Sequence, residues 1–174
     1  MEKLTKLLKS KKLLVSDGAW GTMLQTMGLK SGECPELWCI THKAEIFNLA
    51  RSYIDAGADM VLTNSFGGTR LKLALYGLAE RANELNEKAA AISREAAGAG
   101  KHVLGSMGPT GKILLTGEVT KADMLEAFRE QAIALEKGGA DAACIETMSD
   151  IEEASLAIQA VRESTHLEVI CTFI

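Results

Sequence analysis

Two carboxylates and two small polar residues stand at positions where they could bind a charged ligand. Asp17 and Glu146 each follow a short apolar run, and Asn64 and Ser106 end two other such runs. A pair of carboxylates in one site suits either an ammonium group or the transfer of protons. Whether these residues act together depends on the elements that carry them.

The apolar runs predict five short strands with helices between them. Strands are expected at 13–15, 59–63, 102–106, 141–145 and 167–173. Helical spacing of apolar residues predicts helices at 2–10, 41–57, 69–76, 79–97, 120–138 and 150–163. Residues 24–40 are expected to be irregular, with Thr41 as the cap of the next helix because Glu45 stands near the capping-box position.

The order of elements predicts an α/β fold with a parallel sheet. The strands are short and mostly apolar on both faces, as in a sheet covered by helices. The stretches 55–64 and 136–147 resemble each other, since each has a glycine, then Ala-Asp, then a strand with a polar end. This internal echo favours a repeated β/α unit. Residues 1–174 hold about four and a half such units, and a (β/α)8 TIM barrel needs eight, so we expect a half-barrel.

In a barrel the strand ends meet at one mouth, which would bring Asp17 and Glu146 together. Nearby glycines let backbone amides approach a ligand closely, which suits a carboxylate group. Two carboxylates with free amides would recognise an α-amino acid. Other interpretations stay open: Asp17 could close an Asx-turn, and Glu146 could cap a helix or pair with a lysine. The loop 105–111, Gly-Ser-Met-Gly-Pro-Thr-Gly, could be a phosphate cradle or only a turn.

Composition excludes several classes of protein. The 174 residues carry a net charge of −4 with interspersed charges, so no basic face for nucleic acid is expected. No apolar run approaches membrane-spanning length, and the N-terminus lacks the core of a signal peptide. Four scattered cysteines do not form a disulfide framework, and a cytoplasmic location is expected. Cys34 and Cys39 are spaced poorly for a zinc knuckle without a second pair.

Five motifs, in order, resemble the homocysteine S-methyltransferase family. They are DGAWGTM (17–23), GECPELW (32–38), YIDAGADMVLTNSFGGTR (53–70), GSMGPTG (105–111) and IETMSD (145–150). Within the family they are most similar to the homocysteine-binding domain of cobalamin-dependent methionine synthases. Each motif alone is weak, whereas five in the same order are specific.

The resemblance implies a TIM barrel in which a zinc-bound homocysteine thiolate attacks an activated methyl group. By motif, Asp17 and Glu146 would hold the substrate ammonium, the amide of Gly18 would meet its carboxylate, and Asn64, Ser65 and Ser106 would line the pocket. The sequence leaves the methyl donor open: methylcobalamin on a corrinoid protein or domain, a betaine-like compound and a methylsulfonium all remain possible, and the resemblance to cobalamin-dependent enzymes favours the first modestly.

The sequence departs from the family pattern at the metal. The resemblance implies three zinc-binding cysteines, one on a late strand and a Cys-Cys pair near the end of the barrel, and the four cysteines here match none of them. We therefore expect residues 1–174 to be the N-terminal half of a homocysteine-binding domain that supplies no zinc ligand and is inactive alone. A non-catalytic amino-acid-binding half-barrel, a partner-dependent subunit and a phosphate-binding β/α enzyme are the alternatives. An open half-barrel also predicts self-association through its last strand.

Overall fold

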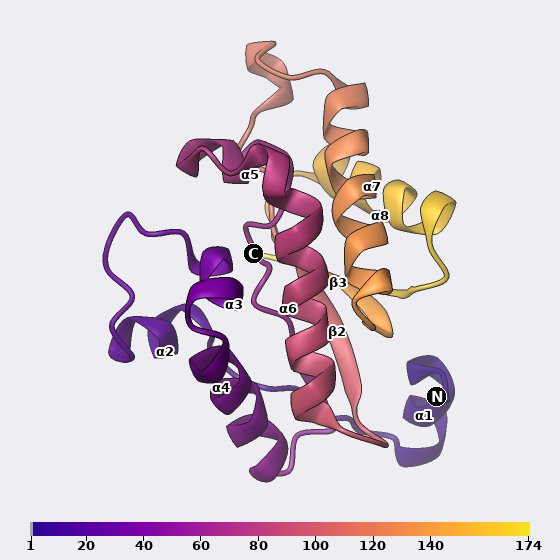
Figure 1. Cartoon of the computed structure of the whole chain (residues 1–174). Helices are drawn as coiled ribbons and strands as arrows, with labels where there is room; N and C mark the ends of the chain where they lie inside the picture. Colours follow the sequence, from indigo (N-terminus) through magenta and orange to yellow (C-terminus); the bar gives the residue numbers. More distant parts are fainter. Residues whose placement is uncertain (1) are drawn as a thin grey trace.

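Helices and short strands alternate along residues 2–174, the part of the chain that the computed structural model describes (Figure 1). The strands are β1 (Met60–Leu62), β2 (His102–Met107), β3 (Ala142–Met148) and β4 (Glu168–Phe173). The α-helices are α1 (Leu4–Lys11), α2 (Gly21–Thr26), α3 (Trp38–Thr41), α4 (Lys43–Asp55), α5 (Arg70–Leu73), α6 (Ala82–Ala97), α7 (Lys121–Lys137) and α8 (Ile151–Ser164). Short 3-10 helices are η1 (Pro35–Leu37), η2 (Ala74–Tyr76), η3 (Ala79–Arg81) and η4 (Leu114–Thr116).

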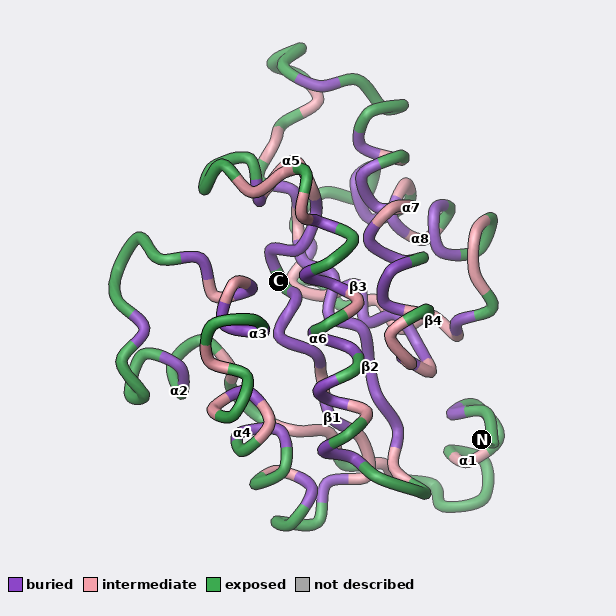
Figure 2. Tube along the Cα trace, viewed as in Figure 1, coloured by how far each residue is buried: buried purple, intermediate pink, exposed green. Residues whose placement is uncertain are grey.

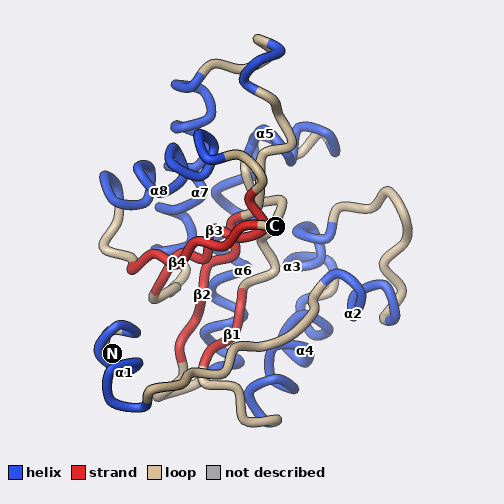
Figure 3. Tube along the Cα trace, turned by 180° about the vertical axis from the view of Figure 1, so that it is seen from behind, coloured by secondary structure: helices blue, strands red, loops and turns tan. Residues whose placement is uncertain are grey.

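The strands form one parallel sheet whose order in space, β1-β2-β3-β4, is their order in the sequence. Helices α6, α7 and α8 lie on one face of this sheet, and the opposite face is open to the viewer in Figure 3. A chain that steps to the next strand each time and keeps its helices on one side is wound as in a β/α barrel. The predicted α/β fold of the TIM-barrel family, present in part, is confirmed.

The main core lies between the sheet and these helices. Met107 and Ile145 from the strands and Phe128 and Leu135 from α7 are fully buried there. Figure 2 shows the buried stretches running along the strands and the inward faces of α6 and α7, with exposed stretches on the outside. A Cβ on Gly138 would lie 2.4 Å from a backbone oxygen of α6, so glycine permits the close approach of α6 and the end of α7.

The predicted first strand at 13–15 is wrong, because this segment is an extended loop. Leu13 is 72% exposed and Val15 is 51% exposed, so neither contributes to a strand-like buried face. Its contacts with the sheet are few: the carbonyl of Val15 accepts from the N–H groups of Asp59 and Met60, and Leu14 packs against the cluster that contains Leu104 and Ala142. One residue of pairing does not make a ladder, and four strands result instead of five.

The region predicted to be irregular, 24–40, contains α2, η1 and α3. Thr41 does not cap the next helix, since it is the last residue of α3 and its hydroxyl donates to the carbonyl of Leu37. His42 precedes α4 without a side-chain cap. By contrast, Thr120 opens α7 as predicted and shares a complete capping box with Asp123. The predicted helix 69–76 is instead the four-residue α5 followed by η2, and the predicted helix 79–97 begins as η3 before α6, while the other predicted helices are present with small shifts of their ends.

The aspartates of the two Ala-Asp pairs make equivalent contacts at the amino-terminal edge of the sheet. The carboxylate of Asp59 accepts from the N–H of Val15 at 3.1 Å, and that of Asp141 accepts from the N–H of Val103 at 2.7 Å. Each carboxylate also pairs with a basic side chain, Lys11 and Arg94 respectively. The repeat between residues 55–64 and 136–147 thus corresponds to the same set of contacts at the start of two strands. None of the helices described in residues 2–174 has the length and apolar character to cross a membrane.

Candidate functional site

A cavity of about 280 Å³ lies at the carboxyl ends of the strands. Five of the six predicted site residues line it: Gly18, Asn64, Ser65, Ser106 and Glu146. The rest of its wall comes from Ala19, Trp20, Gly21, Leu24, Pro35, Glu36, Leu62, Thr63 and Phe66. This wall contains carboxylates and aromatic rings but no lysine, arginine or histidine. The strand ends therefore converge on one cavity that suits a cation better than an isolated anion.

Asp17 lies just behind this wall and is held by neighbouring groups. One carboxylate oxygen, Oδ2, accepts from the N–H of Leu62 at 2.8 Å and from the indole N–H of Trp20 at 2.7 Å. The other, Oδ1, accepts from the hydroxyl of Ser16 at 2.9 Å. Burial outweighs these donors and raises the pKa of Asp17 above its ordinary value. Asp17 thus fixes the turn that carries Gly18 and adds negative charge beside the cavity.

Glu146 reaches the cavity from an irregular point of β3. The β3–β4 register shifts between Ile145 and Met148, and Thr147 has a φ of 61°, a left-handed conformation that is costly for a β-branched residue. The hydroxyl of Ser106 donates to Glu146 Oε1 at 2.5 Å. Burial, and secondarily the charge of Asp17, raise the pKa of Glu146. The charge of Asp17 is therefore near enough to affect the ionisation of Glu146, as expected of two carboxylates that would share one cation.

The hydroxyl groups of the wall are mostly used within the protein. Ser65 Oγ lies 2.5 Å from Thr63 Oγ1 and donates to the carbonyl of Ser106 at 2.7 Å. The N–H of Ser106 donates to Thr63 Oγ1. The side-chain amide of Asn64 donates to the carbonyl of Pro35 at 2.7 Å. Ser65 and Asn64 thus line the cavity chiefly as parts of its frame.

The sequence reasoning missed Glu36, a carboxylate of the wall that is only 4% exposed. Its Oε1 accepts from the N–H of Gly67 at 2.7 Å, and its Oε2 accepts from the thiol of Cys34 at 3.2 Å. Glu36 follows Pro35 at the start of η1, in a segment predicted to be irregular. The signal in the sequence was a charged residue between apolar neighbours, Cys34-Pro35 and Leu37-Trp38.

The cysteines do not assemble a metal site within residues 2–174, where no group of three or more metal-ligating side chains occurs. All four are free thiols. Burial raises the pKa of Cys34, Cys39 and Cys144 to about 12, so these groups are protonated thiols at neutral pH. The described residues therefore do not fit the three-cysteine zinc site that the resemblance implies.

Residues 105–107 belong to β2, and the loop that follows them, 108–111, is held by hydrogen bonds within the protein. The N–H of Thr110 and its hydroxyl both donate to Oε1 of Glu153, each at 2.7 Å, and this glutamate is buried on α8. The N–H of Gly108 donates to the carbonyl of Phe66. Two loop amides are thus bonded within the protein, and the carboxylate of Glu153 beside them disfavours an anion at this loop.

Fold and cavity together define a β/α-barrel protein with a carboxylate-lined site at the strand ends. Residues 14–174 match the family model for homocysteine S-methyltransferases, and the chain belongs to this family. The resemblance drawn from the five motifs is thereby confirmed.

Curated relatives of this chain are far longer than it is. It is 34% identical to methionine synthase of Mycobacterium tuberculosis and 32% identical to that of Mycobacterium leprae, each over 167 residues. These matches cover 89% of the chain but only 14% of either relative.

Solved structures of a related enzyme show the same fold. The oxidized form of the homocysteine methyltransferase MmuM from Escherichia coli is 25% identical, with a TM-score of 0.82 over 99% of this chain and 66% of that one. The metallated form of MmuM has a TM-score of 0.80 over 95% of this chain and 64% of that one, at 24% identity.

Proposed function

We propose that residues 1–174 are the amino-acid-binding part of a homocysteine S-methyltransferase that forms methionine, as methionine synthases do. In this proposal Glu146 and Asp17 neutralise the ammonium group of homocysteine. The amide of Gly18 meets the substrate carboxylate, and Asn64, Ser65 and Ser106 shape the pocket. The single observation that carries the proposal is the pair of partly buried carboxylates with raised pKa at a cavity whose wall has no cation.

The electrostatics favour an ammonium ligand for a physical reason. Burial disfavours the charged forms of Asp17 and Glu146, and the charge of Asp17 further disfavours that of Glu146. A cation bound beside both groups attracts both carboxylates and lowers both pKa values toward the ordinary range. Binding of an amino acid would thus offset part of the free-energy cost of burying these charges.

Methyl transfer needs groups beyond those that line the cavity. The substrate sulfur must lose its proton, and its lone pair must form the new carbon–sulfur bond while the donor keeps the electrons of the bond that breaks. In this proposal zinc and the methyl donor are held by residues other than the four cysteines described above. Methylcobalamin on a corrinoid protein or domain is the proposed donor, as the resemblance of the five motifs to cobalamin-dependent methionine synthases implies.

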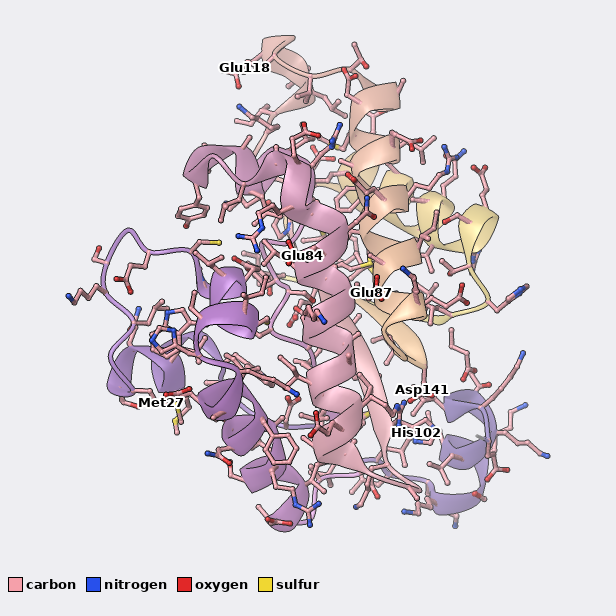
Figure 4. All side chains as sticks on the ribbon, in the orientation of Figure 1. Met27, Glu84, Glu87, His102, Glu118 and Asp141 are labelled. Carbon is pink, nitrogen blue, oxygen red and sulfur yellow. The ribbon has the colours of Figure 1, made fainter. Side chains whose placement is uncertain are left out.

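A calorimetric titration with L-homocysteine tests the proposal, with and without added zinc. Wild-type protein is compared with Glu146→Gln, and with Glu118→Gln as the control. Glu118 is exposed on the segment between β2 and α7 and does not line the cavity, and Figure 4 labels its side chain at the top of the view. We expect zinc-independent binding that only Glu146→Gln weakens. Equal binding by both variants would refute the assignment of Glu146. Binding of inorganic phosphate without binding of homocysteine would favour the phosphate-enzyme alternative.

A further inference from the structure

Glu36 is a buried acid whose presence the ammonium site alone does not explain. It lines the cavity, is 4% exposed, and forms no ion pair with a lysine or arginine among residues 2–174. Burying a carboxylate without a cation is costly unless hydrogen bonds satisfy it. Its partners are the N–H of Gly67 and the thiol of Cys34, and a thiol is a weak donor. The bond to Gly67 is therefore its principal contact.

The segment Cys34–Cys39 is tied to the turn after β1 by four hydrogen bonds. Besides the Glu36–Gly67 bond, the carbonyl of Pro35 accepts from the side-chain amide of Asn64 at 2.7 Å. The thiol of Cys39 donates to the carbonyl of Asn64 at 3.5 Å, and the side-chain amide of Asn64 donates to the Cys39 sulfur at 3.6 Å. Pro35 and Glu36 line one side of the cavity, and residues 64–66 line the adjacent side. These bonds thus set the distance between the two sides.

The turn is also fastened on its far side. The N–H of Gly108 donates to the carbonyl of Phe66, and a Cβ on Gly108 would lie 2.5 Å from the Phe66 ring. A Cβ on Gly67 would lie 2.9 Å from Glu36 Oε1. Any displacement of the Glu36 carboxylate therefore acts on Gly67 and, through Phe66, on the end of β2. The turn has little freedom to compensate.

We propose that Glu36 is a positioning residue of the amino-acid site, which acts by holding the N–H of Gly67 and thereby the cavity wall. The proposal rests on the proposed function, since the ligand of that cavity is taken to be homocysteine. In this role the length of the side chain, which lets it reach the N–H of Gly67, matters more for ligand binding than its negative charge.

Two conservative variants separate reach from charge. Glu36→Gln keeps an oxygen at the Gly67 N–H but removes the charge, whereas Glu36→Asp keeps the charge but is one methylene too short. We expect Glu36→Asp to weaken L-homocysteine binding about tenfold, as for a lost hydrogen bond to a charged group, and Glu36→Gln to weaken it less than about threefold. Glu33→Gln, an exposed acid in the same loop, is the control and should bind as wild type does. The reverse order, with Gln weaker than Asp, would overturn the proposal.

Two further measurements test the hydrogen bond between Glu36 and the Gly67 N–H directly. In the ligand-free protein, hydrogen exchange at the Gly67 amide should be faster in Glu36→Asp than in wild type and in Glu36→Gln. Gly67→Ala should weaken binding in the wild-type background but add little in Glu36→Asp, because the shorter side chain leaves room for the new methyl group. Unchanged exchange or fully additive effects would contradict the proposal. If wild type itself fails to bind homocysteine, the proposed function fails, while the exchange result still decides the role of Glu36.

Discussion

Replacing Glu146 by glutamine should separate stability from binding at the proposed ammonium site. Glutamine keeps the shape of the side chain, and its Oε1 can still accept from the hydroxyl of Ser106, which is 2.5 Å from Glu146 Oε1. Only the charge is lost. A hydrogen bond between charged partners contributes about 1.5–3 kcal/mol. The Kd for L-homocysteine should therefore rise roughly 10- to 150-fold at pH 7.

The same substitution that weakens binding should not weaken the fold. Burial and the charge of Asp17 raise the pKa of Glu146 in the folded protein. A carboxyl group whose folded pKa is raised destabilises the folded state above that pKa, and the penalty is relieved as the pH falls through it. The neutral variant carries no such penalty, and Asp17 loses a like charge nearby. We expect Glu146→Gln to be as stable as wild type at pH 7 or more stable.

The assay is urea unfolding of both proteins at pH 7 and at pH 4.5, together with calorimetric binding at pH 7. The difference between the two proteins isolates Glu146 from the other carboxyl groups. The stability advantage of the variant should shrink toward pH 4.5, where protonation relieves the penalty in wild type. A variant that unfolds more easily than wild type at pH 7, or that binds homocysteine within twofold of wild type, would refute the reasoning.

Three further predictions concern the surroundings of this carboxylate and the open sheet. Ser106→Ala removes the donor to Glu146, so the Kd for homocysteine should rise about fivefold and the acid limb of its pH profile should move to higher pH, as titration calorimetry would show. Thr147→Gly should raise the free energy of unfolding by up to about 1 kcal/mol in urea, because glycine accepts the left-handed backbone at φ 61°. The 174-residue chain should self-associate in sedimentation through β4, whose Phe173 is 54% exposed, and a charged residue at Ile170 should reduce this. A stable, monodisperse wild-type monomer would contradict the last prediction.

The sequence predicted the sheet and its helices because those signals are local. Apolar runs, glycine ends and Ala-Asp repeats specified β1 to β4, and Thr120 marked the start of α7 correctly. The run 13–15 failed because composition alone cannot show whether a strand has a partner along its whole length. Leu13 and Val15 are as apolar as residues of β1, yet only Val15 pairs with the sheet.

The site was predictable where it depends on strand ends and hidden where it depends on tertiary contacts. Asn64, Ser106 and Glu146 reach the cavity because parallel strands deliver their carboxyl ends to one edge. Glu36 lies in a segment without periodicity, and its bond to Gly67 spans 31 positions of the chain. Asp17 was predicted at the site, but the sequence could not show that Trp20 and Leu62 would hold its carboxylate behind the wall.

The two ends of the sheet use the same kind of side chain for opposite purposes. At the amino-terminal edge the Lys11 ammonium and the N–H of Val15 lower the pKa of Asp59, so its charge supports the fold and acid weakens it. At the carboxyl edge burial raises the pKa of Glu146, so its charge opposes the fold and acid relieves it. A carboxylate that is satisfied within the fold has little left for a ligand, whereas one that the fold penalises gains most from an arriving cation. The difference in pKa direction therefore agrees with the proposal that the ligand binds at the carboxyl ends of the strands, while Asp59 stabilises the fold at their amino ends.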